Sequence, residues 1–394
     1  MSIEPQSPRL VGSAPAAVGS PTAAVSRPVA DPDWDEFLRR TPCGQFQQSS
    51  LWAEYKSAEG WQHHRVVLTG ATGIAGGFQI LWKRTRLGRI GYVSKGPVAP
   101  AAERGLQHRL RLRLVDAARE LKLAALVAQD PDEASFEAGP CDACGFVQSN
   151  PMQTIETTYL IDVSAGMDVV RSRMRPRLRR NIREGWKQGV TVREGTEADL
   201  PHFFRLMAAT CARHKTTPNP ASLDALRRLW RIFSPSKSIR LTLVEREGHA
   251  PAALLCLLFG NRVSLWKEGW DGSQPHWHAG ALLEEATFEW AHANGYTLCD
   301  ICGISRSTAL HLLSGKAVTA GAISSRDLFN VRFGGYPKLL PPALVYLPNP
   351  VLRWGYRNIV APWEHSQNGS SRFPAGPVQG TLRTQQSPEE DPVL

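Results

Sequence analysis

The stretch Ile239–Glu268, IRLTLVEREGHAPAALLCLLFGNRVSLWKE, contains three apolar runs separated by turn residues. Short runs rich in Leu, Val and Phe are typical of β-strands, and Gly248 and Gly260 mark the turns between them. The stretch therefore predicts an antiparallel meander with strands at 239–246, 252–259 and 262–268. Periodic apolar residues predict helices at 197–214 and 222–233 before the meander, a helix at 280–294 after it, and a closing strand at 296–302.

The same order of elements occurs earlier in the chain. The patterns predict helices at 33–40, 49–59 and 103–121, and strands at 64–69, 74–82, 90–94 and 124–128. The residues of the two halves do not align, but the order of their elements does, which indicates two copies of one α/β unit around a shared cleft. This order is that of the GNAT acyltransferase fold, so we expect an α/β fold of the α+β type. The expected domains are 31–162, completed by 336–362, and 163–335, with disordered ends at 1–30 and 365–394.

The composition and charge of the chain indicate which classes of partner it binds and in which compartment it resides. The chain has 394 residues and a net charge of +10, which favours RNA, phosphorylated substrates or the inner membrane surface. It lacks a signal-peptide pattern and an apolar run of roughly 18 residues, so we expect a cytoplasmic protein without a transmembrane segment. The seven cysteines are an odd number and indicate reduced thiols. Cys141/Cys144 and Cys299/Cys302 have C-x-x-C spacing, but residues three apart on a strand point to opposite faces, so we expect buried thiols and no metal site.

The segment 171–192, RSRMRPRLRRNIREGWKQGVTV, is strongly basic. Its pattern predicts one amphipathic helix, capped by Ser172 and with Pro176 in its first turn. An apolar stripe is expected at Met174, Leu178, Ile182 and Trp186. A basic stripe that faces phosphate or tRNA is expected at Arg175, Arg179, Arg183 and Lys187. The alternative is a solvated charged face, although such a face usually carries both signs of charge.

Five motifs in order give the chain a family resemblance. They are QSSLWAEYKSAEGW (48–61), GYVSKGPV (91–98), RRNIREGWKQGV (179–190), ANGYTLCDICGI (293–304) and LFNVRFGGYP (328–337). With these motifs the sequence resembles the FemAB family, the peptidoglycan-bridge aminoacyltransferases built from two GNAT-like domains. The resemblance implies transfer of an amino acid from aminoacyl-tRNA to an amine on the stem peptide of a phosphorylated or lipid-linked muropeptide precursor. That reaction needs positioning, a proton acceptor and oxyanion donors rather than a protein nucleophile.

The resemblance also implies site residues. Lys56 matches the lysine of the W-x-x-x-K helix that binds precursor phosphate, although alone it would be an ordinary exposed lysine. Arg213 is the candidate for the second-domain arginine that faces the same phosphates, with His214 and Lys215 beside it. Asp130 and Asp300 end the closing strands of the two units, where a catalytic base would fit, but strand-end aspartates more often cap turns.

One motif departs from the family pattern. F-K-x-x-F-G-G is present as FNVRFGG, with Phe329 retained and Asn330 in place of the lysine that helps to hold the tRNA end. Asn330 brings no charge, and Arg332, two residues along an expected strand, is the candidate replacement cation. An acyl thioester donor in polysaccharide, lipid or natural-product assembly is therefore a second hypothesis. The R/Q-x-x-G-x-G/A turn of coenzyme A users is missing before both central helices, so acyl-CoA ranks below aminoacyl-tRNA, and no other cofactor is expected.

A non-enzymatic RNA-binding protein is the third hypothesis, although no RNA-binding motif supports it. The closing segment 339–360 mixes apolar, aromatic and arginine residues and is expected to pack on the first domain or touch the inner membrane surface. We expect a monomer.

Overall fold

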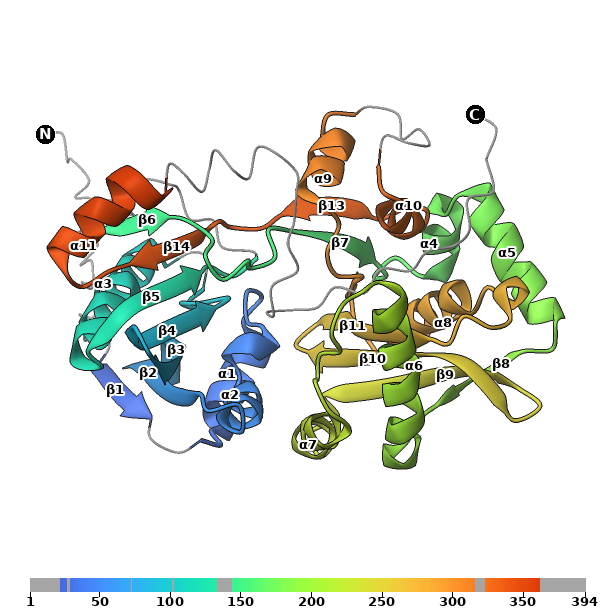
Figure 1. The fold of residues 1–394 in the computed structure, drawn as a ribbon, viewed down its shortest axis with the longest axis horizontal. Helices are drawn as coiled ribbons and strands as arrows, with labels where there is room; N and C mark the ends of the chain where they lie inside the picture. The colour runs from blue at the N-terminus through green and yellow to red at the C-terminus, as the bar shows by residue number, and fades with distance from the viewer. Residues whose placement is uncertain are drawn as a thin grey trace, which may run out of the picture.

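The computed structural model describes residues 22–26, 29–71, 73–100, 103–132, 144–315 and 323–361. Two seven-stranded mixed sheets lie side by side, each with helices on its faces (Figure 1). The first sheet has the strand order β1-β2-β3-β4-β5-β14-β6, and the second has the order β13-β7-β12-β11-β10-β9-β8. This confirms the predicted pair of GNAT-like α/β units.

The first sheet is built on the predicted meander of β2 (Gln62–Gly70), β3 (Gly73–Thr85) and β4 (Gly88–Ser94). After the meander, α3 (Arg104–Glu120) crosses over to β5 (Leu123–Gln129), which pairs in parallel with β4. One apolar stripe of α3, with Leu106, Leu110 and Leu114, is buried against this sheet. The edge strand β1 (Thr22–Ser26) pairs with β2, so the expectation of disorder was wrong for these five residues. Residues 29 and 30 are described without regular structure, and residues 1–21, 27–28 and 365–394 lie outside the described residues.

The second sheet repeats the plan with β9 (Ile239–Arg246), β10 (His249–Phe259) and β11 (Arg262–Trp270). The helix α8 (Ala279–Ala293) then leads to β12 (Leu298–Asp300), which is parallel to β11. One face of this sheet packs against α8, and the other packs against α6 (Leu200–Arg213) and α7 (Leu223–Phe233). A four-residue strand, β8 (Thr191–Glu194), and a 3-10 turn, η2 (Glu197–Asp199), precede α6.

Strands at both ends of the second unit change the expected boundaries. The structure places β7 (Thr157–Asp162) between β12 and β13 in the second sheet, whereas the sequence assigned residues up to 162 to the first domain. The strand β13 (Tyr336–Leu339) also belongs to the second sheet, and only β14 (Ala343–Tyr346) returns to the first, between β5 and β6 (Phe146–Gln148). An apolar run predicts a strand but not its pairing partner, which depends on tertiary contacts.

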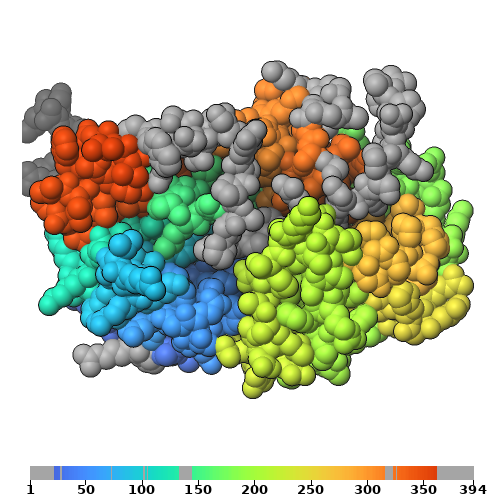
Figure 2. All heavy atoms as spheres, in the orientation of Figure 1, coloured from blue at the N-terminus to red at the C-terminus, as the bar shows by residue number. Residues whose placement is uncertain are grey.

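The two domains share a buried core. It joins α1 (Pro32–Arg40) and α2 (Ser50–Ser57) of the first domain to α6, α7 and the facing strands of the second. Between the first two helices lies a 3-10 turn, η1 (Phe46–Gln48). Trp52 of α2 packs edge-on against Trp266 of β11, and Arg39 lies over the ring of Phe259. Figure 2 shows the blue surface of the first domain directly against the yellow-green surface of the second. This continuous core fixes how the domains face each other.

The basic segment differs from its prediction. It forms two helices, α4 (Met167–Arg173) and α5 (Pro176–Lys187), instead of one, and Pro176 is the first residue of α5. Arg175 has an extended ψ of 143° because a residue that precedes proline is excluded from the helical region. The Ser172 hydroxyl donates to the Val169 carbonyl inside α4 and therefore caps no helix start.

The motif around Phe329 was expected on a strand, and that prediction was wrong. It forms α10 (Ser325–Val331), and Arg332 is the C-cap residue that follows this helix. The remaining helices are α9 (Arg306–Leu313), α11 (Pro350–Gly355) and two short turns, η3 (Pro275–Trp277) and η4 (Tyr356–Val360). Among the described residues, none of the helices has the length and apolar character needed to cross a membrane.

Candidate functional site

A β-bulge shapes β11 where it faces the first domain. Lys267 is opposite Leu255 of β10 and Leu265 is opposite Cys256, so Trp266 is an extra residue without a cross-strand partner. The Trp266 ring packs against Trp52 of the first domain, with 6.4 Å between ring centroids. The bulge therefore places one residue of β11 in contact with the other domain.

One edge of β11 loses its partner strand beside this bulge. The parallel pairing of β11 with β12 ends at Ser264 and Asp300, whereas β11 continues to Trp270. A strand edge without a neighbour offers backbone N–H and C=O groups to an extended ligand. Cys302, just beyond the end of β12, adopts a left-handed φ of 60°.

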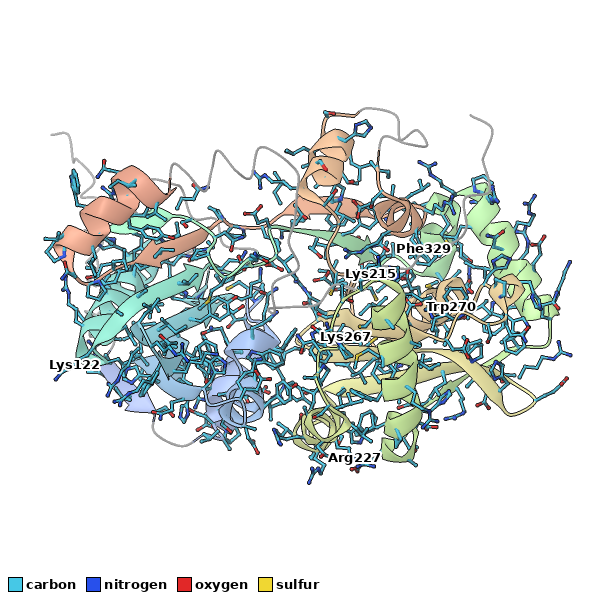
Figure 3. The ribbon with its side chains drawn as sticks, viewed as in Figure 1. Lys122, Lys215, Arg227, Lys267, Trp270 and Phe329 are labelled. Carbon is cyan, nitrogen blue, oxygen red and sulfur yellow. The ribbon has the colours of Figure 1, made fainter. Side chains whose placement is uncertain are left out.

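Lys267 is a buried amine at the bulge. Its Nζ lies 5.0 Å from the centroid of the Trp266 ring, and Figure 3 places the residue on the side of the second domain that faces the first. Burial lowers the pKa of Lys267 to about 8, although the nearby Cys302 and Cys211 thiols act in the opposite direction. An amine with this pKa can accept and donate a proton near neutral pH. Sequence reasoning missed Lys267, and the available signal was a lysine directly after the strand run RVSLW of residues 262–266.

A buried charged network joins the ends of the two closing strands. The carboxylate of Asp132 lies 2.6 Å from Lys95 Nζ and 2.6 Å from the guanidinium of Arg262, and it accepts a 2.7 Å hydrogen bond from Gln45. Arg262 also contacts Asp300 at 3.4 Å. Burial alone would raise the pKa of Asp132, but Lys95 and Arg262 hold it well below its usual range. Asp132 and Arg262 belong to different domains, so this network stabilises their relative position.

The two predicted catalytic aspartates lie at this junction but have different partners. Asp130 is buried and paired with Arg111 at 2.5 Å, and burial raises the pKa of Asp130 to about 6. Asp300 accepts hydrogen bonds from the Thr158 hydroxyl and, at 2.9 Å, from the backbone N–H of Cys302. Asp300 also pairs with Arg262, so both of its carboxylate oxygens have partners that fix the end of β12. With a pKa of about 6, Asp130 can exchange a proton near neutral pH.

Lys56 and Arg213 lie on separate elements around the domain interface. The Lys56 ammonium forms a 2.5 Å ion pair with Glu59 and lies 5.4 Å from the centroid of the Trp52 ring. The same Trp52 ring packs against Trp266, the bulge residue. Arg213, at the end of α6, stacks over Trp270 at 4.9 Å and donates to the Trp270 carbonyl. Arg213 is therefore oriented directly by β11, and Lys56 is oriented by Glu59 and by Trp52, whose ring packs against Trp266 of β11.

The predicted residues Phe329, Asn330 and Arg332 lie on the face of the second sheet that packs against α8. Phe329 packs against Phe333, and a side chain at Gly280 would meet Phe329 at 3.5 Å and the Glu268 carboxylate at 2.8 Å. Asn330 is buried on α10, and Arg332 follows at its end instead of on the same strand face. Burial lowers the pKa of Arg332, and the neighbouring Arg177 and Arg175 lower it further. The structure thus gathers positive charge where α10 meets α5.

The expected basic stripe has mixed roles. Arg179 donates to the carbonyl groups of Arg171, Ser172 and Met174 and so terminates α4, whereas Arg183 and Lys187 are exposed. Leu178 and Ile182 are buried as predicted, but Trp186 is partly exposed and donates to Glu285. Only part of the stripe is therefore available to an anionic ligand.

Two buried acidic side chains interact where β11 meets α8: Glu268 belongs to β11 and Glu284 to α8. Burial raises the pKa of Glu268 to about 7. Burial and the neighbouring Glu268 raise the pKa of Glu284 well above its usual range, and Glu284 Oε2 has no hydrogen-bond partner among the described residues. No group of three or more His, Cys, Asp or Glu suited to a metal ion occurs in the described part of the chain. Cys299 is buried, whereas Cys141 lies outside the described residues.

Comparisons with known proteins agree with this architecture. Residues 29–131 match the FemAB family model, and residues 172–307 match the acetyltransferase (GNAT) domain model. A UDP-N-acetylmuramoylpentapeptide-lysine N(6)-alanyltransferase from Weissella viridescens is 26% identical over 295 residues, which is 70% of this chain and 84% of that protein.

Solved structures show the same fold. The crystal structure of FemX superposes with a TM-score of 0.72 at 16% identity and covers 85% of this chain and 99% of that one. The structure of L-PGS from Bacillus licheniformis has a TM-score of 0.50 at 12% identity and covers 84% and 97% of the two chains. The two-domain arrangement predicted from the sequence is confirmed.

Proposed function

We propose, from the membership of this chain in the FemAB family, that it transfers an aminoacyl group to an amine on the stem peptide of a peptidoglycan precursor. The chain is an acyltransferase with two GNAT-like domains, and its curated relative is an alanyltransferase that acts on a UDP-linked muramoylpentapeptide. That relative carries the proposal. The geometry of the domain interface supports it, because a bulged strand, a half-paired strand edge and a buried amine meet there.

The proposed chemistry needs one proton carrier. The acceptor amine attacks the ester carbonyl carbon of the donor, so the N–C bond forms and the ester C–O bond to the ribose breaks. We assign the proton released by the amine to Lys267 Nζ, which then returns it to the departing ribose oxygen. A pKa of about 8 suits both steps, since the group must change protonation twice in each cycle. Backbone N–H groups of the half-paired β11 edge are the candidate donors to the oxyanion.

Lys56 and Arg213 are the proposed ligands of the acceptor phosphates. Lys56 is held by Glu59 and the Trp52 ring, and Arg213 by Trp270, so both cations are oriented before the substrate binds. A guanidinium that stacks on an indole ring still presents N–H groups at its edges to phosphate. Because the two residues belong to different domains, the precursor would bridge the interface.

The proposed donor is aminoacyl-tRNA, although Asn330 replaces the family lysine. Arg332, Arg175 and Arg177 gather where α10 meets α5, and exposed Arg183 and Lys187 extend this positive region along α5. The acyl-CoA alternative meets an obstacle at the start of α8. The Glu268 carboxylate lies against Gly280 in the first turn of that helix, where a pyrophosphate would otherwise bind. The Glu268 side chain takes up that space and, when ionised, repels a second anion, which favours the tRNA donor.

The proposed setting is the cytoplasm, at the inner face of the membrane, where charged tRNA and muropeptide precursors meet. The protein would act as a monomer, because the domain interface is already complete within one chain.

The test compares donors directly. The full chain is incubated with a UDP-linked muramoylpentapeptide and either labelled aminoacyl-tRNA or labelled acetyl-CoA, with and without ribonuclease. We expect label on the precursor from the tRNA only, and its loss with ribonuclease. Transfer from acetyl-CoA that survives ribonuclease would overturn the proposed donor, and no transfer to any muropeptide would overturn the proposed acceptor.

A further inference from the structure

An unusual surface occurs at the end of the described chain, on α11 and η4. Four large apolar side chains are highly exposed there: Val351 at 74%, Leu352 at 59%, Trp354 at 66% and Ile359 at 65%. Isolated exposed apolar residues are ordinary, but a group on two consecutive turns indicates an interaction surface. We call these four residues the apolar face of α11–η4.

The four residues of the apolar face lie on one side of the helix, which they share with Asn358, and the two arginines lie on the other. At 100° per residue, Val351, Leu352, Trp354 and Ile359 fall within a single sector of about 160°. Arg353 and Arg357 lie on the opposite side, toward the body of the first domain. There Tyr356 bonds to Ser149 at 2.7 Å, and Arg357 donates to the Phe146 carbonyl. The protein therefore anchors this helix by its polar side and leaves the apolar side outward.

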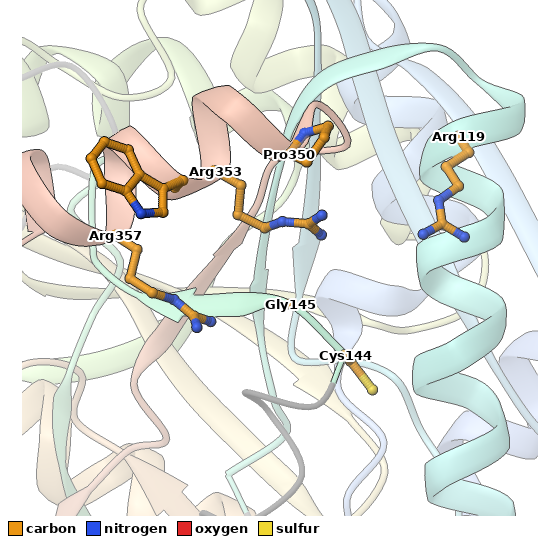
Figure 4. Close-up of a pocket in the computed structure, with 7 residues that line it drawn as sticks. Arg119, Cys144, Gly145, Pro350, Arg353 and Arg357 are labelled. Atoms are coloured by element: carbon orange, nitrogen blue, oxygen red, sulfur yellow. The ribbon is translucent and has the colours of Figure 1, made fainter.

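Positive charge lies directly beside the apolar face. Arg119, Arg353 and Arg357 line a hollow between α11–η4, α3 and the Cys144–Gly145 turn (Figure 4). None of the described residues that line it is acidic, and Arg119 pairs with Asp116 at 3.5 Å. In Figure 4, Arg353 extends from α11 toward α3, and Arg119 extends from α3 toward α11. The Arg353 guanidinium lies 5.3 Å from the centroid of the Tyr346 ring, which leaves its edges available to an anion.

We propose that α11–η4 docks the protein onto an anionic lipid surface, with its apolar face in the acyl-chain boundary and the arginine-lined hollow on lipid phosphate. Trp with branched aliphatic residues is typical of interfacial helices, and adjacent arginines select anionic headgroups. Figure 1 shows α11 at the outer end of the first domain, away from the second, so docking there leaves the domain interface accessible. This inference rests on the proposed function only for its biological purpose, since lipid binding needs no catalysis.

The role of the apolar face of α11–η4 is tested by co-sedimentation of the full chain with lipid vesicles. Vesicles of phosphatidylcholine alone are compared with an equimolar mixture of phosphatidylcholine and phosphatidylglycerol. The double variant Leu352→Ser/Trp354→Ser should weaken binding about tenfold or more. The control Leu310→Ser/Leu313→Ser removes similarly exposed side chains from α9 of the second domain and should bind like the wild type.

The role of the arginine-lined hollow is tested by replacing one arginine of α3 that lines it and one that does not. Arg119→Gln should weaken binding to the anionic vesicles about fivefold, whereas Arg109→Gln, about 15 Å earlier on the same helix, should have little effect. Raising the salt concentration should weaken wild-type binding to the anionic mixture. Equal binding to both vesicle types would overturn the role of the hollow.

Two outcomes would overturn the docking surface itself. One is the absence of binding to either vesicle, or binding that Leu352→Ser/Trp354→Ser leaves unchanged. The other is a wild-type dimer in solution that becomes monomeric in that variant, which would make the face a contact between two copies of this chain. Aminoacyl transfer to the soluble UDP-linked precursor should be unchanged in the variant, so failure of lipid binding is distinguishable from failure of the proposed enzyme activity.

Discussion

Replacing Asp132 with Asn tests whether the buried network holds the two domains together. The substitution keeps the side-chain shape and removes the charge that Lys95 and Arg262 share at 2.6 Å each. All three side chains are buried, so the variant leaves two cations in the interior, of which Arg262 retains Asp300 at 3.4 Å. Breaking a buried ion pair from one side costs about 3–5 kcal/mol of unfolding free energy, and the remaining Asp300 contact places the expectation near about 3 kcal/mol.

The loss should be measurable as a lower melting temperature. At about 2 °C per kcal/mol for a large domain, Asp132→Asn should melt about 6 °C below the wild type at pH 7. The matched control is Asp116→Asn, since Asp116 is half exposed and pairs only loosely, with Arg119 at 3.5 Å and Arg113 at 3.9 Å. An exposed pair of this kind contributes at most about 1 kcal/mol, so the control should melt within about 2 °C of the wild type.

The pH dependence gives a second check on the same residue. The folded-state pKa of Asp132 lies below the unfolded value, so its stabilisation is complete above the unfolded pKa of about 4 and is lost as the pH falls through the folded pKa. The difference between wild type and variant should therefore stay constant from pH 5 to pH 8 and shrink in stronger acid. Equal melting temperatures for wild type and Asp132→Asn at pH 7 would refute the assignment of this network as the domain lock.

Three further predictions concern the site. Lys56→Ala should raise the KM for the UDP-linked precursor by about tenfold or more with a smaller change in kcat, and Lys122→Ala, an exposed lysine of the same domain, should change neither in steady-state assays. Lys267→Met should lower kcat about 100-fold and abolish the rise in rate that the wild type shows around a pH of about 8; an unchanged pH–rate profile would exclude Lys267 as the proton carrier. Glu268→Gln should raise the melting temperature more at pH 8 than at pH 5. The pKa of Glu268 is about 4 in the unfolded chain and about 7 in the folded one, so its ionisation makes folding less favourable as the pH rises through this range. A larger gain at pH 5 would contradict this.

Local patterns in the sequence predict most elements of both domains. The meander at 239–268 and its counterpart at 62–94 follow from apolar runs and glycine turns, which depend on neighbouring residues alone. The break between α4 and α5 was also open to prediction, because Pro176 excludes Arg175 from the helical region. That signal was outweighed by the regular spacing of the apolar and basic stripes.

Features that depend on tertiary pairing could not be predicted. The exchange of β7 and β13 into the second sheet depends on which strands pair, and the bulge at Trp266 depends on the register between β10 and β11. The contact between Asp132 and Arg262 joins residues 130 positions apart. The resemblance indicated Lys56 and Arg213, but only the fold shows that Lys267 is buried on β11.

The most direct test of the central claim is to locate the new bond. The full chain is incubated with aminoacyl-tRNA and a UDP-linked muramoylpentapeptide, and the product is analysed by tandem mass spectrometry. We predict a mass gain of one amino-acid residue, with the new amide on an amine of the stem peptide, and no gain after ribonuclease treatment. An unmodified stem peptide, or an added group that is not an amino acid, would contradict the assignment of this chain as a peptidoglycan aminoacyltransferase.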